Sequence, residues 1–125
     1  MKKNILAVDD ERVILDLLVD CANLCNYNCY TAPDGLEALS ILEKENIDLV
    51  VADIVMPNMN GFELLEAVRK KWPKLPIVLM TGFSGKLAEA LAMNQKADGV
   101  ISKPFDLPEL KKIFAQFLNP EKPTN

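Results

Sequence analysis

The chain has 125 residues, of which 14 are Lys or Arg, 18 are Asp or Glu and none is His, so its formal net charge is -4. This length fits one domain that buries its own core, and the apolar share of 50% excludes a disordered chain. The lack of His excludes Ser-His-Asp and Cys-His hydrolysis and His-ligated zinc within this chain. The acidic net charge argues against a protein whose main function is to bind the phosphates of nucleic acid.

The apolar runs are all about as long as a strand, whereas a membrane-spanning helix needs roughly 20 apolar residues. The first run, residues 5–8, ends at Asp9 and Asp10, so it does not form the core of a signal peptide. We therefore expect a cytoplasmic chain that makes no contact with a membrane.

Strand and helix signals alternate along the first half of the chain, as in a parallel α/β sheet. Residues 4–8 predict a strand. The helical stripe that follows consists of Ile14, Leu17, Leu18, Cys21, Leu24 and Cys25. Residues 29–31 predict a short second strand, and Asp34-Gly35-Leu36-Glu37 is a variant capping box that opens a second helix. Residues 49–52 are apolar on both faces, which predicts a buried third strand.

The alternation continues in the second half. Asn60-Gly61-Phe62-Glu63 is another variant capping box, and its helix must end near Trp72-Pro73 because proline breaks a helix interior. Residues 76–80 predict a fourth strand, and a short, weakly amphipathic helix is expected over about residues 86–94. Residues 99–102 predict a fifth strand.

Asp106 caps the last predicted helix, whose apolar stripe is Leu110, Ile113, Phe114, Phe117 and Leu118. Residues 120–125 have no apolar periodicity, so we expect a tail or the start of a linker after one domain at residues 1–119. The pattern as a whole predicts an α/β fold with a five-stranded, doubly wound parallel sheet and right-handed crossovers. In such a sheet, ligands bind outside the carboxyl ends of the strands.

Three cysteines, Cys21, Cys25 and Cys29, form a C-x3-C-x3-C row. Three thiols without a fourth ligand make a weak metal site, and Cys29 lies on a different predicted element from the other two. We interpret them as small apolar residues in or near the core of a reduced protein.

Polar side chains follow four of the predicted strands. Asp9 and Asp10 follow the first strand, Asp53 the third, Thr81 the fourth and Lys103 the fifth. These groups emerge at one edge of the sheet, where carboxylates raise each other's pKa unless a cation intervenes. Mg2+ uses one or two carboxylates together with phosphate oxygens and water, so the pattern predicts a magnesium site.

The same residues suit phosphoryl transfer to a carboxylate, in which an Asp acts as nucleophile and forms an acyl phosphate. The metal and Lys103 offset charge on the transferring group, and the Thr81 hydroxyl can hold a phosphate oxygen. Asp53 is the best candidate nucleophile, because it ends the central strand while Asp9 and Asp10 approach from the neighbouring one.

Four motifs stand in order at strand ends. They are Val8-Asp9-Asp10-Glu11, the D-x-x-M-P-x-M-x-G string at residues 53–61, Met80-Thr81-Gly82 and Ser102-Lys103-Pro104-Phe105. With these motifs, residues 3–118 resemble the receiver domain of two-component response regulators. The resemblance implies a flavodoxin-like three-layer sandwich with the sheet order 2-1-3-4-5.

The resemblance also implies a role for each acidic residue. Asp53 would be the phosphoacceptor of a phosphorelay. Asp9 and Asp10 would hold Mg2+, and Asp53 with the backbone carbonyl of Val55 would complete the protein ligands.

Further roles follow from the resemblance for the residues after the last two strands. Thr81 would bind the phosphoryl group and swing towards it, and Lys103 would pair with the phosphate. Gly82 would keep the approach to the acyl phosphate open. The bond between Lys103 and Pro104 would be a cis peptide.

The implied phosphoryl donor is a phosphohistidine on a sensor histidine kinase or phosphotransfer domain, which fits the lack of His in this chain. The output would pass to a downstream protein partner or a fused output domain, without direct contact to nucleic acid. The chain would not be an enzyme beyond catalysing its own Asp phosphorylation and dephosphorylation. Residues 79–84 also resemble receivers fused to sensor kinases, so a stand-alone regulator and a part of a larger protein both fit the sequence.

Some positions depart from the family's usual pattern. Many receivers carry Tyr or Phe three residues before the Lys of the fifth strand, where this chain has Val100. The ordinary aromatic switch therefore cannot operate there, and we expect coupling through the loop and helix after Thr81, where Phe83 is the nearest ring. Val55 and Phe83 occupy the two positions that tune the lifetime of the acyl phosphate. Neither can orient water by a hydrogen bond, which predicts slow self-hydrolysis.

Two other function classes are alternatives, and each would need residues that this chain lacks. A small phosphatase with an Asp nucleophile carries D-x-D at the nucleophile strand, and here Val55 replaces the second Asp, which serves as general acid. A flavodoxin-like FMN-binding module needs a Ser/Thr/Gly-rich phosphate loop after the first strand, where the Asp9-Asp10-Glu11 segment would repel phosphate.

Overall fold

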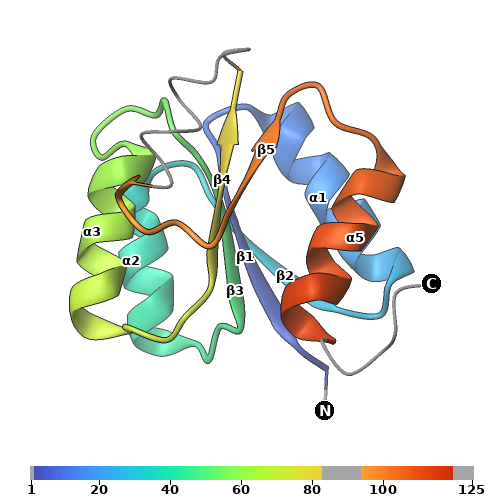
Figure 1. Cartoon of the computed structure of the whole chain (residues 1–125), viewed down its shortest axis with the longest axis horizontal. Helices are drawn as coiled ribbons and strands as arrows, with labels where there is room; N and C mark the ends of the chain where they lie inside the picture. Colours follow the sequence, from blue (N-terminus) through green and yellow to red (C-terminus); the bar gives the residue numbers. More distant parts are fainter. Residues whose placement is uncertain (1, 83–93, 120–125) are drawn as a thin grey trace.

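The computed structural model describes residues 2–82 and 94–119, which form a central parallel sheet between two layers of helices (Figure 1). The strands are β1 (Asn4–Val8), β2 (Asn28–Ala32), β3 (Leu49–Asp53), β4 (Ile77–Thr81) and β5 (Gly99–Ser102). The helices within the described residues are α1 (Arg12–Leu24), α2 (Gly35–Lys44), α3 (Gly61–Lys71) and α5 (Leu107–Leu118). The sheet order β2-β1-β3-β4-β5, with all neighbours parallel, confirms the predicted fold.

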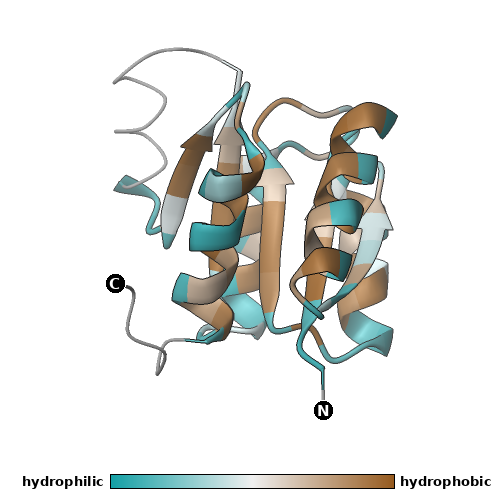
Figure 2. Cartoon of the chain, turned by 90° about the vertical axis from the view of Figure 1, so that its right-hand side faces the viewer, coloured by the Kyte–Doolittle hydropathy of each residue, from teal (hydrophilic) through white to brown (hydrophobic). Residues whose placement is uncertain are grey.

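Each face of the sheet has its own core. Helices α2 and α3 cover one face, and α1 and α5 cover the other (Figure 1). Because side chains alternate between the faces of a strand, Val50 packs under α2 and α3 whereas its neighbour Val51 packs under α1 and α5. Every residue of β3 and β4 is buried, and hydrophobic residues concentrate in the middle of the molecule (Figure 2). The sequence predicted this two-sided burial for β3.

The observed strand boundaries lie within one residue of the predicted ones, and α3 ends at Lys71, directly before Trp72. The helix expected over about residues 86–94 lies outside the described residues except for its last position. The tail expected at residues 120–125 lies outside them as well.

The predicted caps form in two ways. At α3 the capping box is complete, because the Asn60 side chain accepts from the backbone of Glu63 and the Glu63 side chain accepts from the backbone of Asn60. At α2 and α5, the N-cap residues Asp34 and Asp106 each accept one backbone hydrogen bond at 2.9 Å from the residue three positions on. All four bonds satisfy N–H groups that the start of a helix leaves without a partner.

The predicted stripe of α1 is wrong at Leu24, which is 68% exposed. The buried residues of this helix are Leu15, Leu18, Cys21 and Ala22. Leu24 follows Leu15 by nine residues, which is about 180° around an α-helix, so it faces away from the core.

The three cysteines are free thiols in or against the α1/α5 core. Cys21 lies on α1, Cys25 is the residue that ends α1, and Cys29 lies on β2. Burial raises the pKa of Cys21 to about 11 and that of Cys29 to about 12, so both thiols stay protonated at neutral pH. Their surroundings agree with the interpretation as small apolar core residues.

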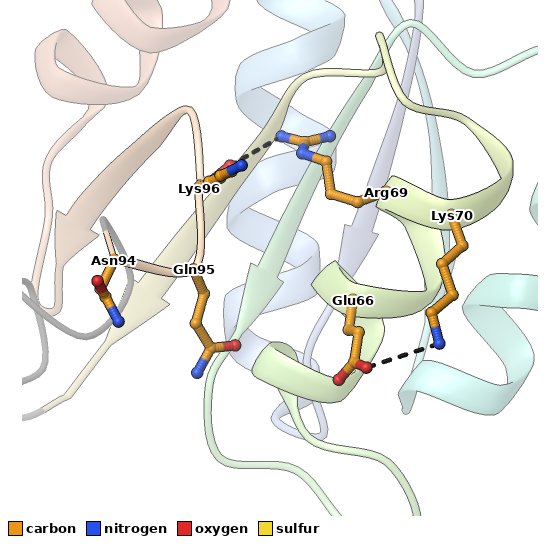
Figure 3. Close-up of a pocket in the computed structure, with 6 residues that line it drawn as sticks. All are labelled: Glu66, Arg69, Lys70, Asn94, Gln95 and Lys96. Atoms are coloured by element: carbon orange, nitrogen blue, oxygen red, sulfur yellow. Dashed lines mark hydrogen bonds and ion pairs between the residues drawn. The ribbon is translucent and has the colours of Figure 1, made fainter.

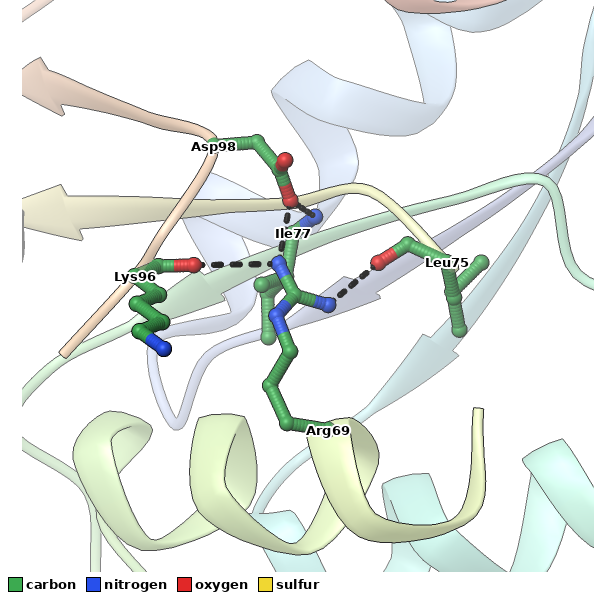
Figure 4. A network of polar contacts seen from close by, with 5 residues as sticks. All are labelled: Arg69, Leu75, Ile77, Lys96 and Asp98. Carbon is green, nitrogen blue, oxygen red and sulfur yellow. Dashed lines mark hydrogen bonds and ion pairs between the residues drawn. The ribbon is translucent and has the colours of Figure 1, made fainter. Parts of the chain in front are cut away.

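Arg69 joins α3 to the starting ends of β4 and β5 (Figure 4). Its guanidinium donates to the backbone oxygens of Leu75 and Lys96 at 2.7 and 3.2 Å and pairs with the carboxylate of Asp98. Asp98 also accepts from the backbone N–H of Ile77 at 2.8 Å. This network lies at the amino ends of the strands, away from the edge where the candidate site is expected.

Among residues 2–82 and 94–119, no helix has the length and apolar character required to span a membrane.

We predict that Gly61→Ala destabilises the protein by about 1–3 kcal/mol, the usual cost of forcing an extra methyl into a packed site. A Cβ at this position would lie 2.5 Å from the backbone oxygen of Asp53 and 2.9 Å from the Cα of Ile54, both of which are backbone atoms. Urea unfolding measures the loss. Gly99→Ala is the matched control, because its Cβ would meet side chains at an ordinary 3.6 Å or more. Equal stabilities of the two variants would contradict the prediction.

Candidate functional site

Three carboxylates meet where β1 and β3 end. Oxygens of Asp9, Asp10 and Asp53 all lie within 4.8 Å of one another. They come together because β1 and β3 are neighbours in register, with Val8 opposite Ala52. Asp9 is fully buried and Asp53 is 6% exposed, whereas Asp10 faces solvent. The structure thus brings together the three acids predicted to share a metal.

Lys103 reaches this cluster from the segment after β5. Its Nζ lies 2.7 Å from Oδ2 of Asp9, 3.4 Å from Oδ2 of Asp53 and 3.5 Å from Oε1 of Glu11. The backbone N–H of Lys103 donates to the carbonyl of Thr81 at 2.7 Å, and the peptide bond to Pro104 is cis as expected. The ammonium is therefore placed between the two buried carboxylates.

Thr81 ends β4 at the same edge of the sheet. It pairs in register with Ser102, and the residue is 2% exposed. The predicted set of Asp9, Asp10, Asp53, Thr81 and Lys103 therefore lies at one edge, although these residues are spread from position 9 to 103 of the chain.

A cleft of about 460 Å³ opens onto this cluster. It is lined by Asp10, Glu11, Asp53, Val55, Gly82 and Lys103. Val55 is 58% exposed on the β3–α3 loop, defined here as residues 54–60. Both Val55 and Gly82 thus border the cleft. Phe83, the other position expected to tune the acyl phosphate, lies outside the described residues.

A larger hollow of about 670 Å³ lies elsewhere, between α3 and residues 94–96 (Figure 3). Glu66 and Arg69 of its lining belong to α3, and Lys70 pairs with Glu66 at 3.6 Å. We assign the site to the smaller cleft, because the three carboxylates, the Lys103 ammonium and the strand ends meet there.

Burial and charge perturb the groups in the cleft. Burial raises the pKa of Asp53 to about 6, and the Asp9 carboxylate adds to this effect while Lys103 opposes it. Burial likewise raises the pKa of Asp9 against the lowering effect of its hydrogen bond to Lys103. Burial alone would lower the pKa of Lys103, but the hydrogen bond to Asp9 and the charge of Asp53 outweigh it and raise the pKa. The site holds more negative charge than Lys103 offsets.

The donor set fits a hard divalent cation. Carboxylate oxygens close enough to share one ion, with one exposed member facing a cleft, are the ligands that Mg2+ prefers.

The loop that carries the Val55 carbonyl is held at both ends, because Ile54 donates to the carbonyl of Met80 at 3.0 Å and Gly61 to that of Ile54 at 2.8 Å.

Two contacts near the site were not predicted from the sequence. Glu11 pairs with Lys103, which the row of three acids at the end of β1 could have suggested. Asn58, with a left-handed φ of 68°, donates its side-chain amide to Asp34 at 2.9 Å. Because asparagine tolerates this backbone conformation, an Asn at position 58 is consistent with a turn. Nothing in the local sequence indicated that Asp34 would be its partner.

The family model described as the response regulator receiver domain matches residues 5–115. The sensor histidine kinase RcsC of Salmonella typhi is 36% identical over 113 residues, which are 90% of this chain and 12% of that kinase. The RcsC kinase of Escherichia coli K12 is 35% identical over the same shares of the two chains. The chain therefore spans about an eighth of the length of these curated relatives.

Solved structures show the same fold. The chemotaxis protein CheY4 of Vibrio cholerae is 31% identical, with a TM-score of 0.88 over 94% of this chain and 100% of that one. NtrX of Brucella abortus is 30% identical, with a TM-score of 0.90 over 96% of this chain and 28% of that one.

We predict that Asp53→Asn stabilises the Mg2+-free protein by about 2 kcal/mol at pH 8 and by almost nothing at pH 4. Folding raises the pKa of Asp53 from 3.8 to about 6, so the folded state binds the Asp53 proton more tightly than the unfolded state does. The contribution of this proton to the free energy of unfolding is fully present below the unfolded pKa and is lost as the pH rises through about 6. Removing the ionisable group removes that loss. Urea unfolding across this pH range in a chelator measures the difference between the variant and the wild type.

Asp16→Asn serves as the control, because the Asp16 side chain is exposed and forms an i,i+4 pair with Arg12 on the surface of α1. Its stability should differ from the wild type by less than about 0.5 kcal/mol at either pH. A gain for Asp53→Asn that stays constant with pH would contradict the prediction.

Proposed function

The chain belongs to the response regulator receiver domain family, and on this premise we propose that Asp53 accepts a phosphoryl group from a phosphohistidine on a partner protein. The partner would be a sensor histidine kinase or a phosphotransfer domain of a two-component phosphorelay. The observation that carries the proposal is the position of Asp53, which ends the central strand, borders the cleft and lies beside Asp9 and Lys103.

The transfer is a displacement at phosphorus. A carboxylate oxygen of Asp53 forms the new O–P bond while the P–N bond of the phosphohistidine breaks, and the imidazole nitrogen keeps the bonding electron pair. Attack requires the ionised form of Asp53. The charge of Lys103 favours that form, because it lowers the pKa that burial and Asp9 raise.

Asp9, Asp10, Asp53 and the backbone carbonyl of Val55 would hold Mg2+, which when bound would offset negative charge on the transferring group. The observation in favour of this ligand set is the excess of carboxylate over ammonium charge in a cleft open to solvent.

Lys103 and Thr81 would stabilise the phosphorylated state. The Lys103 ammonium, 3.4 Å from the Asp53 carboxylate, is near enough to pair with a phosphoryl oxygen on that carboxylate. The Thr81 hydroxyl would bind a second oxygen by moving towards it. Val100 packs against the α2/α3 core and carries no ring, so the proposed switch uses no aromatic side chain at that position.

The chain would act on itself and not on a separate substrate, catalysing only the phosphorylation and dephosphorylation of Asp53. We place this activity in the cytoplasm, where its phosphohistidine donors would be found. The signal would pass to a downstream protein partner or a fused output domain.

We predict that acetyl phosphate with Mg2+ adds one phosphoryl group to Asp53, detected by intact-mass and peptide mass spectrometry. Asp53→Asn should abolish the modification because no nucleophile is left, whereas Asp16→Asn, an exposed acid on α1, should leave it unchanged. Lys103→Met should slow it about a hundredfold, as the loss of a charge-stabilising donor does elsewhere.

Other outcomes of this experiment would point to the other function classes. Release of phosphate from added phosphomonoesters, without a stable modification, would support a phosphatase. A bound yellow cofactor would support an FMN protein.

We also predict that the acyl phosphate of Asp53 is long-lived and that Val55→Asn shortens its lifetime about tenfold, since an amide beside the cleft can orient an attacking water. Release of labelled phosphate in Mg2+ measures the lifetime. Val13→Asn is the matched control, being a valine that is 75% exposed and is not among the residues lining the cleft. Equal lifetimes for Val55→Asn and the wild type would refute this role of position 55.

A further inference from the structure

We propose that Asp34, the N-cap residue of α2, is a positioning residue for the β3–α3 loop, and that it acts through Asn58. The inference rests on the proposed function, in which this loop supplies the Val55 carbonyl as a metal ligand. It assigns a second task to a residue that the sequence explains as a helix cap alone.

The two oxygens of the Asp34 carboxylate have different partners. Oδ1 accepts from the backbone N–H of Glu37 at 2.9 Å and so caps α2. Oδ2 accepts from the side-chain amide of Asn58 at 2.9 Å, across 24 positions of the sequence. These hydrogen bonds lower the pKa of Asp34, so the carboxylate is ionised at neutral pH and both bonds are charge-assisted.

A packing contact lies directly beside this hydrogen bond. A Cβ built on Gly35 would lie 2.7 Å from Cγ of Met59 and 2.9 Å from its Cβ, so the Met59 side chain rests on the bare backbone of Gly35. Consecutive residues at the start of α2 thus hold consecutive residues of the β3–α3 loop.

The loop needs such a support between its ends. Ile54, the first residue of the loop, donates a backbone hydrogen bond to Met80 of β4. Gly61, which directly follows the loop, donates a backbone hydrogen bond to Ile54. In between, Val55 is 58% exposed, Asn58 takes a left-handed φ of 68° and Met59 donates to the carbonyl of Pro57 at 2.7 Å. The turn at residues 57–59 is tight, and the Asp34–Asn58 bond sets where it lies relative to the sheet edge.

Two substitutions separate positioning from capping. Asp34→Ser keeps an oxygen that can accept from Glu37 and cap α2, but it lacks the second oxygen for Asn58. Asn58→Gly keeps the left-handed backbone but lacks the amide. Asp106→Ser is the matched control, because Asp106 caps α5 by the same bond to Glu109 at 2.9 Å and the cap lies on another helix.

The first measurement is amide hydrogen exchange in the Mg2+-free full chain. Asp34→Ser and Asn58→Gly should each speed exchange at the amides of residues 55, 56, 58 and 59, because the turn loses its link to α2, while Asp106→Ser should not. This measurement needs no metal, so it decides the positioning role even if the proposed function fails. Unchanged exchange in both variants would overturn the proposal.

The second measurement is Mg2+ affinity by calorimetry. Each of the two variants should weaken binding by about tenfold, the lower end of what losing a supporting contact behind a metal ligand costs. The double variant should be no weaker than either single one, because both remove one bond. Asp106→Ser should bind like the wild type. Additive losses, or wild-type affinity in both single variants, would overturn the proposal, whereas a wild type that binds no Mg2+ would overturn the proposed function.

Discussion

The pairing of Lys103 with Asp9 and Asp53 is the interaction on which the rest of the site depends. Two carboxylates that are almost fully buried next to each other repel, and burial makes the repulsion stronger because little water screens it. One ammonium, 2.7 Å from the first carboxylate and 3.4 Å from the second, offsets part of that charge. The pKa of Asp53 still rises to about 6, so the compensation is incomplete. A site left with surplus negative charge at the bottom of a cleft is arranged to take up more positive charge from outside.

The fold holds these groups in place by burying the elements that carry them. Asp53 is the last residue of β3, and β3 is buried at every position between β1 and β4. Behind it, α3 starts so close that Gly61 leaves no room for a Cβ against the Asp53 carbonyl. Lys103 is fixed in turn by the bond from its backbone N–H to Thr81. The carboxylates cannot relieve their repulsion by moving apart, because such a movement would open the most densely buried part of the sheet.

Much of this arrangement followed from sequence patterns that act locally or through topology. Apolar runs of strand length predicted the strands, and the Asn60–Glu63 capping box predicted the start of α3. Parallel strands present their carboxyl ends at one edge of a sheet, which predicted that Asp9, Asp53 and Lys103 lie close together. Contacts that depend on the path of a loop could not be predicted in this way. The Asp34–Asn58 bond is an example, since capping alone accounts for an Asp at position 34. The exposure of Leu24 shows a similar limit for helices, because a stripe of apolar residues does not determine which of its members are buried in the core.

The incomplete compensation also links the chemistry of the site to the state of its acceptor. The proposed attack of Asp53 on phosphorus requires its carboxylate form, yet burial and the neighbouring Asp9 favour its protonated form, and a pKa of about 6 lies close to neutral pH. In the proposed reaction, a proton and the phosphoryl donor would therefore compete for the same oxygen as the pH falls towards that value. Any added positive charge in the cleft lowers this pKa and stabilises the fold at the same time, because both effects relieve one repulsion. On the proposed function, the readiness of Asp53 to receive a phosphoryl group and the stability of the folded chain thus both depend on the charge balance around Lys103.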